Sequence, residues 1–178
     1  MKVSVIIISK NRDDSLTQEY EKYFDEVFFV NSINTLSELF SKIDSDYIMI
    51  TLENEFYAED GYMLTTYLKS HNLDFVVGNR VNNNQYQKLS NIYKLCNRRA
   101  SHKWSKLTKH YIPDLFSTCY ILSKKFYKKL NITNNFQLDC ITHSDNFAYI
   151  DIRFVNQSYS KLFSIKKYIS ARLYRKEN

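Results

Sequence analysis

The chain has 178 residues, of which 44% are hydrophobic and 16% aromatic, so it is long enough for one domain with its own core. Only two glycines and one proline are present, which excludes the disordered and collagen-like classes. No apolar run reaches the length of a membrane-spanning helix, and the N-terminus lacks a signal-peptide pattern. We therefore expect a cytoplasmic protein that is soluble or peripheral on a membrane.

Cysteine and histidine do not indicate a metal site. Cys96, Cys119 and Cys140 are widely spaced and form no C-x-x-C pair, which predicts free thiols in a reducing compartment. The four histidines show no ligand spacing.

The charge is divided unevenly along the chain. Residues 1–79 carry 6 basic and 14 acidic side chains, whereas residues 80–178 carry 19 basic and 5 acidic ones. Eight lysines and arginines, and no acid, lie between Arg80 and Pro113. Such a stretch attracts phosphate groups, whether of nucleotides, lipid headgroups or nucleic acid.

The first 80 residues alternate between short apolar runs and amphipathic segments. The runs predict buried strands at residues 2–9, 26–30, 46–52 and 75–78. The segments between them predict helices at residues 13–24, 36–43 and 58–70. This order predicts an α/β fold with a mostly parallel sheet flanked by helices, in which ligands bind beyond the carboxyl ends of the strands.

The second half is less regular. It predicts a long basic helix at 89–107, a strand at 116–122, short helices at 123–130 and 136–143, a strand at 148–155 and a basic amphipathic helix at 164–175. No internal repeat or Pro/Gly linker divides the chain, so we expect a single compact domain.

The sharpest local feature is the pair of carboxylates Glu53-x-Glu55, directly after a predicted buried strand. Two such side chains at a strand end are suited to Mg²⁺ or Mn²⁺, which prefer oxygen ligands and offset the charge of a departing diphosphate. The alternative is a pair of solvated glutamates in a turn.

The order of segments resembles family 2 glycosyltransferases. VSVIIISKNR at 3–12 is similar to the opening strand of that family, DYIMITLENEFYAEDGYM at 46–63 to the segment of its D-x-D metal motif, and DFVVGNR at 74–80 to the next strand. The second half looks like the polyprenyl-phosphate branch, which includes the dolichyl-phosphate mannose synthases. The similar pieces there are residues 114–117, 124–125, 136–139 and 160–162.

This resemblance covers nearly the whole chain and implies a GT-A fold. It implies a glycosyltransferase domain at 1–160, with a nucleotide-binding half at 1–80 and an acceptor half at 81–160, followed by a basic helix at 161–178. It also implies an inverting, metal-assisted transfer from a UDP- or GDP-sugar to a lipid phosphate, such as a polyprenyl phosphate, or to a glycan. The sequence departs from the family in four places. Glu53-x-Glu55 stands for D-x-D, and Asn31-Ser32 stands for an acidic pair. A strand–helix unit common in the family is missing before the helix at Leu36, and residues 155–159 lack the Arg and Gly usual before the Ser-Lys pair.

Under this hypothesis the roles follow from charge and position. Glu53 and Glu55 hold Mn²⁺ or Mg²⁺, and an acceptor hydroxyl would need Asp114 or Asp139 as its base. The expected donor-binding residues are Ser9, Asn11, Arg12, Asn31 and Glu53. The expected binders of phosphate or acceptor are Arg80, Lys94, Arg98 and Lys161.

The C-terminal segment has two interpretations. Residues 160–178 carry six basic side chains and one acidic one, beside an apolar side, which is typical of a helix lying on an anionic membrane. The other interpretation is a terminal helix packed on the domain with its basic face in water.

Two other functions compete with the enzyme. The first is a GT-A-like binding domain that has lost catalysis. The second is a nucleic-acid-binding protein, suggested by the acid-free stretch. However, the aromatic residues of that stretch fall mostly at helix-core spacing rather than forming a stacking platform: Tyr86, Tyr93, Trp104 and Tyr111.

Overall fold

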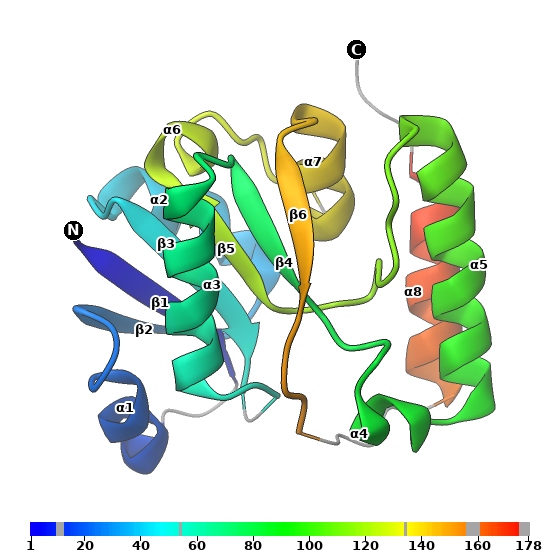
Figure 1. Ribbon diagram of the computed structural model, residues 1–178, viewed down its shortest axis with the longest axis horizontal. Coiled ribbons are helices and arrows are strands. Elements are labelled where there is room, and N and C mark those ends of the chain that lie inside the picture. The colour runs from blue at the N-terminus through cyan, green and yellow to red at the C-terminus, as the bar shows by residue number, and fades with distance from the viewer. Residues whose placement is uncertain (10–12, 54, 134, 156–160, 175–178) are drawn as a thin grey trace.

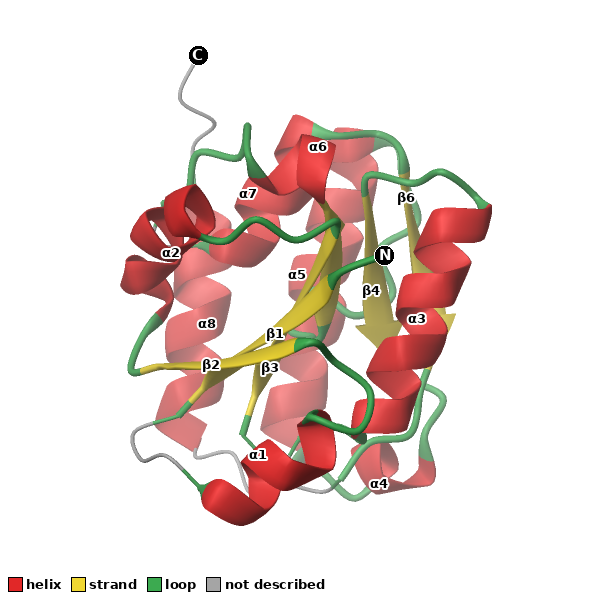
Figure 2. Ribbon diagram, turned by 90° about the vertical axis from the view of Figure 1, so that its left-hand side faces the viewer, coloured by secondary structure: helices red, strands yellow, loops and turns green. Residues whose placement is uncertain are grey.

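A computed structural model places six strands in one sheet, in the order β2-β1-β3-β5-β4-β6 (Figures 1 and 2). It describes residues 1–9, 13–53, 55–133, 135–155 and 161–174, with the side chains of 161–164 excepted. The strands are β1 (Val3–Ile8), β2 (Glu26–Val30), β3 (Tyr47–Leu52), β4 (Phe75–Asn79), β5 (Tyr120–Ser123) and β6 (Phe147–Asp151). The helices are α1 (Asp14–Tyr20), η1 (Ile33–Thr35), α2 (Leu36–Lys42), α3 (Ala58–Ser70), α4 (Asn84–Gln87), α5 (Asn91–Thr108), α6 (Lys124–Tyr127), α7 (Phe136–His143) and α8 (Lys161–Leu173).

The predicted α/β fold with a mostly parallel sheet is confirmed. β1 pairs in parallel with β2 and β3, and β4 pairs in parallel with β6. β5 lies between β3 and β4 and runs antiparallel to both. The carboxyl ends of β1, β2, β3, β4 and β6 therefore all meet at one edge of the sheet.

Two predicted strands in the second half have the wrong bounds. β5 begins at Tyr120 rather than at residue 116, because the segment before it bonds to α5: the Phe116 amide donates to Asn97 Oδ1 (3.1 Å). β6 ends at Asp151 rather than at 155, and Val155 donates instead to the Glu55 carbonyl (3.0 Å).

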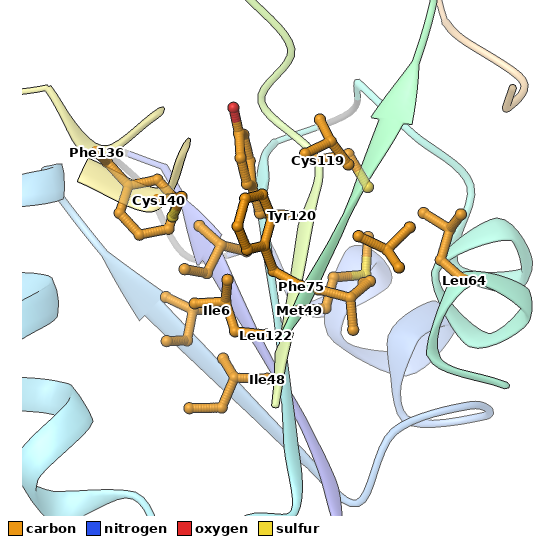
Figure 3. Packing of buried hydrophobic residues seen from close by; sticks show 14 of the residues in the cluster. Ile6, Ile48, Met49, Leu64, Phe75, Cys119, Tyr120, Leu122, Phe136 and Cys140 are labelled. Carbon is orange, nitrogen blue, oxygen red and sulfur yellow. The ribbon is translucent and has the colours of Figure 1, made fainter. Parts of the chain in front are cut away.

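Helices cover both faces of the sheet (Figure 2). Strand alternation sends Met49 and Cys119 toward α3, where Leu64 lies, and sends Ile6 and Ile48 to the opposite face (Figure 3). These side chains are all essentially buried, so the core is continuous through the sheet. Such two-sided burial explains why the strands read as unbroken apolar runs.

The last helix packs against α5 (Figure 1). The Trp104 indole nitrogen donates to the Ala171 carbonyl (2.9 Å), and both residues are buried. The outer side of α8 leaves three apolar side chains exposed: Ile165, Ile169 and Leu173. Within the described ranges, the chain contains no helix with the length and apolar character needed to cross a membrane.

Candidate functional site

Three strands end together at the edge where the sequence predicts the donor site. The Ser9 amide donates to the Val30 carbonyl (3.0 Å), and the Glu53 amide donates to the Ile8 carbonyl (3.2 Å). The Ser9 hydroxyl also donates to the Glu53 carboxylate. Asn31 is exposed directly after β2. The fold thus brings three of the predicted donor-binding residues to one edge.

Three other predicted residues lie wholly or partly outside the described residues. Asn11 and Arg12 fall in the segment 10–12 after β1. Lys161 is the first residue of α8, and its side chain is outside the described part. Their assignments stay predictions.

The two glutamates of the E-x-E pair take different partners. Glu53 is partly exposed and accepts from Ser9. Glu55 is completely buried: its Oε1 accepts from Arg80 Nη1 (2.7 Å), and its Oε2 accepts from the Thr118 hydroxyl. No cluster of three or more His, Cys, Asp or Glu suited to a metal ion occurs among the described residues. In this arrangement the pair does not fit a metal site with two carboxylate ligands, because both carboxylate oxygens of Glu55 already accept hydrogen bonds from buried groups.

Arg80 is the centre of this buried ionic cluster. Its Nε donates to Asp114 Oδ2 (2.8 Å) and its Nη2 to Asp114 Oδ1 (2.9 Å), a bidentate grip. Nη2 also donates to the Tyr93 hydroxyl (2.9 Å). Although burial disfavours the charged guanidinium, Asp114, Tyr93 and Glu55 together hold the pKa of Arg80 well above its usual value. We call Glu55, Arg80, Tyr93 and Asp114 the Arg80 cluster.

A polar stripe on the buried face of α5 holds the loop that carries Asp114. Asn97 Nδ2 donates to Asp114 Oδ1 (2.8 Å), and Ser101 Oγ accepts from the Leu115 amide (3.0 Å). Tyr93, Asn97 and Ser101 are four residues apart, so they share one helix face. Sequence reasoning overlooked this stripe; three polar residues at core spacing were the signal that could have shown it.

The remaining candidates lie apart from the Arg80 cluster. Lys94 and Arg98 sit on the outer side of α5, beside a surface hollow that they share with Gln87. Asp139 is completely buried in α7 and accepts from the Thr133 amide (2.7 Å) and the Tyr174 hydroxyl (2.8 Å). The roles expected for Arg80, Asp114 and Asp139 require their buried networks to open, and they stay predictions.

An apolar cavity of about 210 Å³ lies beneath α8. Its walls come from the ends of β1 and β3, from the loop after Asp114, from the start of α7 and from α8. It reaches the Arg80 cluster through Thr118, which lines the cavity and donates to Glu55. No sequence pattern indicates this cavity, because its walls come from segments far apart in the chain.

The aromatic residues of the basic stretch are mostly in the core, as their spacing predicts. Tyr86, Tyr93 and Trp104 are all buried, whereas Tyr111 is 83% exposed. The three buried rings therefore offer no face on which a base can stack.

The fold is similar to that of solved structures. The sequence matches no protein-family model, and no curated protein matches it either. Glucosyl-3-phosphoglycerate synthase from Mycobacterium tuberculosis, in complex with Mn²⁺, UDP-glucose and phosphoglyceric acid, superposes with a TM-score of 0.68 at 11% identity, over 97% of this chain and 78% of that one. The same enzyme with phosphoglyceric acid alone gives 0.66 at 11% identity over the same shares. With Mn²⁺, UDP and phosphoglyceric acid it gives 0.64 at 10% identity, over 97% and 77%. This protein therefore has the fold of the GT-A-type glycosyltransferases.

Proposed function

We propose that this chain is a nucleotide-sugar-dependent glycosyltransferase that transfers a sugar to a phosphorylated acceptor. The observation that carries the proposal is the convergence of Ser9, Asn31 and Glu53 at the carboxyl edge of a GT-A-type sheet. In open α/β sheets that edge is where ligands bind. The similar enzyme is described with UDP-glucose and phosphoglyceric acid, which supports a UDP-sugar donor and an acceptor with a phosphate.

We assign roles at the donor site according to which side chains are accessible. Glu53, Ser9 and Asn31 contact the donor, together with Asn11 and Arg12. A divalent ion such as Mn²⁺ would offset the charge of the leaving diphosphate. Because Glu55 is buried against Arg80, it is not a metal ligand in this arrangement.

The burial of Asp114 and Asp139 favours one kind of acceptor. Asp114 and Asp139 are both completely buried and hydrogen-bonded, so neither is placed to take a proton from an incoming hydroxyl. An acceptor that attacks through an already ionised oxygen, such as a phosphate oxygen, needs no such base. Lys94, Arg98 and Lys161 are the cations we assign to its phosphate, the first two on the outer side of α5.

We further propose that α8 holds the enzyme at a membrane surface where a lipid-phosphate acceptor resides. Ile165, Ile169 and Leu173 repeat every four residues on its outer side, flanked by the exposed cations Lys166 and Arg172. Such a face suits an anionic bilayer, since each cation near the surface adds about 1 kcal/mol. Flotation with vesicles of phosphatidylcholine, with and without phosphatidylserine, tests this. We expect salt-sensitive binding to the anionic vesicles that Ile169→Glu abolishes, whereas Met63→Glu, an exposed apolar position on α3, leaves it intact.

A second candidate is a GT-A-like binding domain without catalysis. The Arg80 cluster favours it, because Glu55 is buried against Arg80 and only Glu53 of the pair is partly exposed. In this case the GT-A-type fold serves binding while transfer is lost.

Calorimetric titration with UDP-glucose and GDP-mannose, with and without Mn²⁺ or Mg²⁺, separates the two. The enzyme proposal expects metal-dependent binding that Glu53→Gln weakens by about tenfold or more, the scale of one charged contact. Glu38→Gln is the matched control, since Glu38 is exposed on α2. Release of UDP upon adding a phosphorylated acceptor supports transfer. Binding without release, or no nucleotide binding at all, favours the second candidate.

A further inference from the structure

Two helices that pack against each other, α5 and α8, carry lysines and arginines but no acid (Figure 1). α5 contributes five of these basic residues and α8 contributes four, and neither helix contains an aspartate or a glutamate. Like charges on adjacent helices repel one another, and an anion placed between them relieves that repulsion. An anion site is therefore expected where the cations of the two helices meet.

The cations meet at a surface hollow along the seam between α5 and α8. Two small residues, Ala100 of α5 and Ala171 of α8, line it and are buried where the helices approach each other. Its other lining residues are three cations and one tyrosine: Arg99, Lys103, Arg172 and Tyr168. We call the space lined by these six residues the seam hollow.

The three cations of the seam hollow have donors to offer a ligand. Lys103 Nζ donates to the Arg172 carbonyl (2.8 Å) and lies over the Trp104 ring, 5.6 Å from its centroid. These contacts hold the ammonium at the seam, and an ammonium has three N–H donors, of which this bond uses one. Arg99 and Arg172 are both exposed, and within the described ranges no hydrogen bond or ion pair engages either guanidinium.

The number and kind of these donors suit a phosphate monoester. Such a group carries nearly two negative charges at neutral pH and has three acceptor oxygens, and the seam hollow offers three cations. A guanidinium can bind a phosphate through two parallel hydrogen bonds, whereas an ammonium contributes a compact point charge. A carboxylate, with one charge and two oxygens, would leave a larger excess of positive charge in the hollow.

We propose that the seam hollow binds a phosphate monoester, which Arg99, Lys103 and Arg172 recognise. This inference does not rest on the glycosyltransferase proposal, because α5 and α8 line the hollow and the carboxyl edge of the sheet does not. The phosphate belongs either to a lipid headgroup or to a free molecule. A lipid would meet an apolar border, since the exposed Ile169 lies three residues before Arg172 on the same helix.

NMR titration of the ¹⁵N-labelled protein with inorganic phosphate, compared with chloride at equal ionic strength, tests the site. We expect phosphate, but not chloride, to shift the backbone amide signals of Ala100 and Ala171 in a saturable manner. The amide signal of Leu64, buried in α3, should stay unmoved.

Two variants with the same change in net charge assign the recognition to its residues. Arg99→Gln removes one cation of the seam hollow and should weaken phosphate binding about tenfold, the scale of one charged hydrogen-bonded contact. Lys22→Gln is the matched control, because it removes one charge from an exposed position just after α1 and should leave the affinity unchanged. The proposal is overturned if phosphate and chloride produce the same shifts, or if both variants weaken phosphate binding equally.

Flotation with vesicles identifies the source of the phosphate. Phosphatidic acid presents a phosphate monoester, whereas phosphatidylserine does not, so phosphatidylcholine vesicles containing one or the other are compared at equal surface charge. A preference for phosphatidic acid that Arg99→Gln removes assigns the seam hollow to a lipid headgroup. Equal binding to both vesicles, beside saturable binding of inorganic phosphate, assigns it to a free phosphorylated molecule.

Discussion

Arg80→Met should lower the stability of the fold strongly, although methionine is also a long, unbranched side chain. The substitution leaves Glu55 and Asp114, both with no exposed side-chain surface, without their cation. Removing one partner of a buried ion pair costs about 3–5 kcal/mol. In a chain of this size each kcal/mol lowers the melting temperature by about 2–4 °C, so we expect a loss of about 6–20 °C.

Calorimetric or fluorescence-monitored thermal unfolding measures this loss, with Arg153→Met as the matched control. Arg153 also contacts two carboxylates, Glu59 Oε2 (2.5 Å) and Asp60 Oδ1 (2.8 Å), but its side chain is 53% exposed. Water screens the exposed guanidinium of Arg153, and Asp60, although its side chain is only 8% exposed, keeps the hydrogen bond from the Arg153 amide. The control should therefore lose much less stability than Arg80→Met. If Arg80→Met lowers the melting temperature no further than Arg153→Met does, the Arg80 cluster is not the buried network described above.

A triple variant distinguishes the effect of the unpaired charges from the effect of the lost guanidinium packing. Combining Arg80→Met with Glu55→Gln and Asp114→Asn removes all three charges while keeping similar shapes. Because the uncompensated charges cause the penalty, the triple variant should recover most of the lost stability. A triple variant as unstable as Arg80→Met alone would instead show that the guanidinium's packing or hydrogen bonds dominate.

Three further predictions concern other parts of the molecule. The pKa of Lys167, lowered to about 8 in the folded chain, lies below the value of about 10.4 for an unfolded lysine. Between these values the unfolded state binds more protons, so urea titrations should show the free energy of unfolding rising from pH 8 to pH 10 relative to Lys167→Met; a pH-independent difference contradicts the shift. Trp104→Phe removes the donor to the Ala171 carbonyl and should cost about 1 kcal/mol, with faster amide exchange along α8; unchanged exchange in α8 would show that this bond does not anchor the helix. In Gly78→Ala, the new methyl would overlap the Ile152 side chain and lie 3.1 Å from the Cys119 Cβ, so chemical denaturation should reveal a loss of about 1–3 kcal/mol. Ile152→Val in the same background should restore part of that loss, whereas a fully stable Gly78→Ala would mean that the Ile152 side chain moves aside freely.

The fold was largely predictable, because the helix caps and apolar runs of the sequence indicate the same helices and strands that pack together in the structure. α3 and α7 have the predicted bounds, and Asp13 caps α1 by accepting from the amides of Ser15 and Leu16. Apolar runs at β1, β3 and β4 indicate burial on both faces. The central place of β5 was not predictable, since its partners β3 and β4 are chosen by packing across the whole domain.

The site was only partly predictable, for a physical reason. Residues that end neighbouring parallel strands must meet, so Ser9 and Glu53 could be placed together from the sequence. The partner of Glu55 could not, because Arg80 is 25 residues away and turns inward instead of toward solvent. For a charged side chain at a strand end, the sequence does not indicate whether the side chain is buried in the protein or exposed to solvent.

The place of β5 has a consequence for how the chain reaches its native state. In the sheet, β5 lies between β3 and β4 and hydrogen-bonds to both. A nascent chain that stops before residue 120 therefore contains β1, β2 and β3 on one side and β4 on the other, without the strand that joins them. Until that strand emerges, β3 presents a bare hydrogen-bonding edge, the kind of surface on which other chains can dock and aggregate. Synthesis must therefore pass Tyr120 before the sheet can close, and a ribosome pausing upstream of that residue would leave the edge of β3 open for longer.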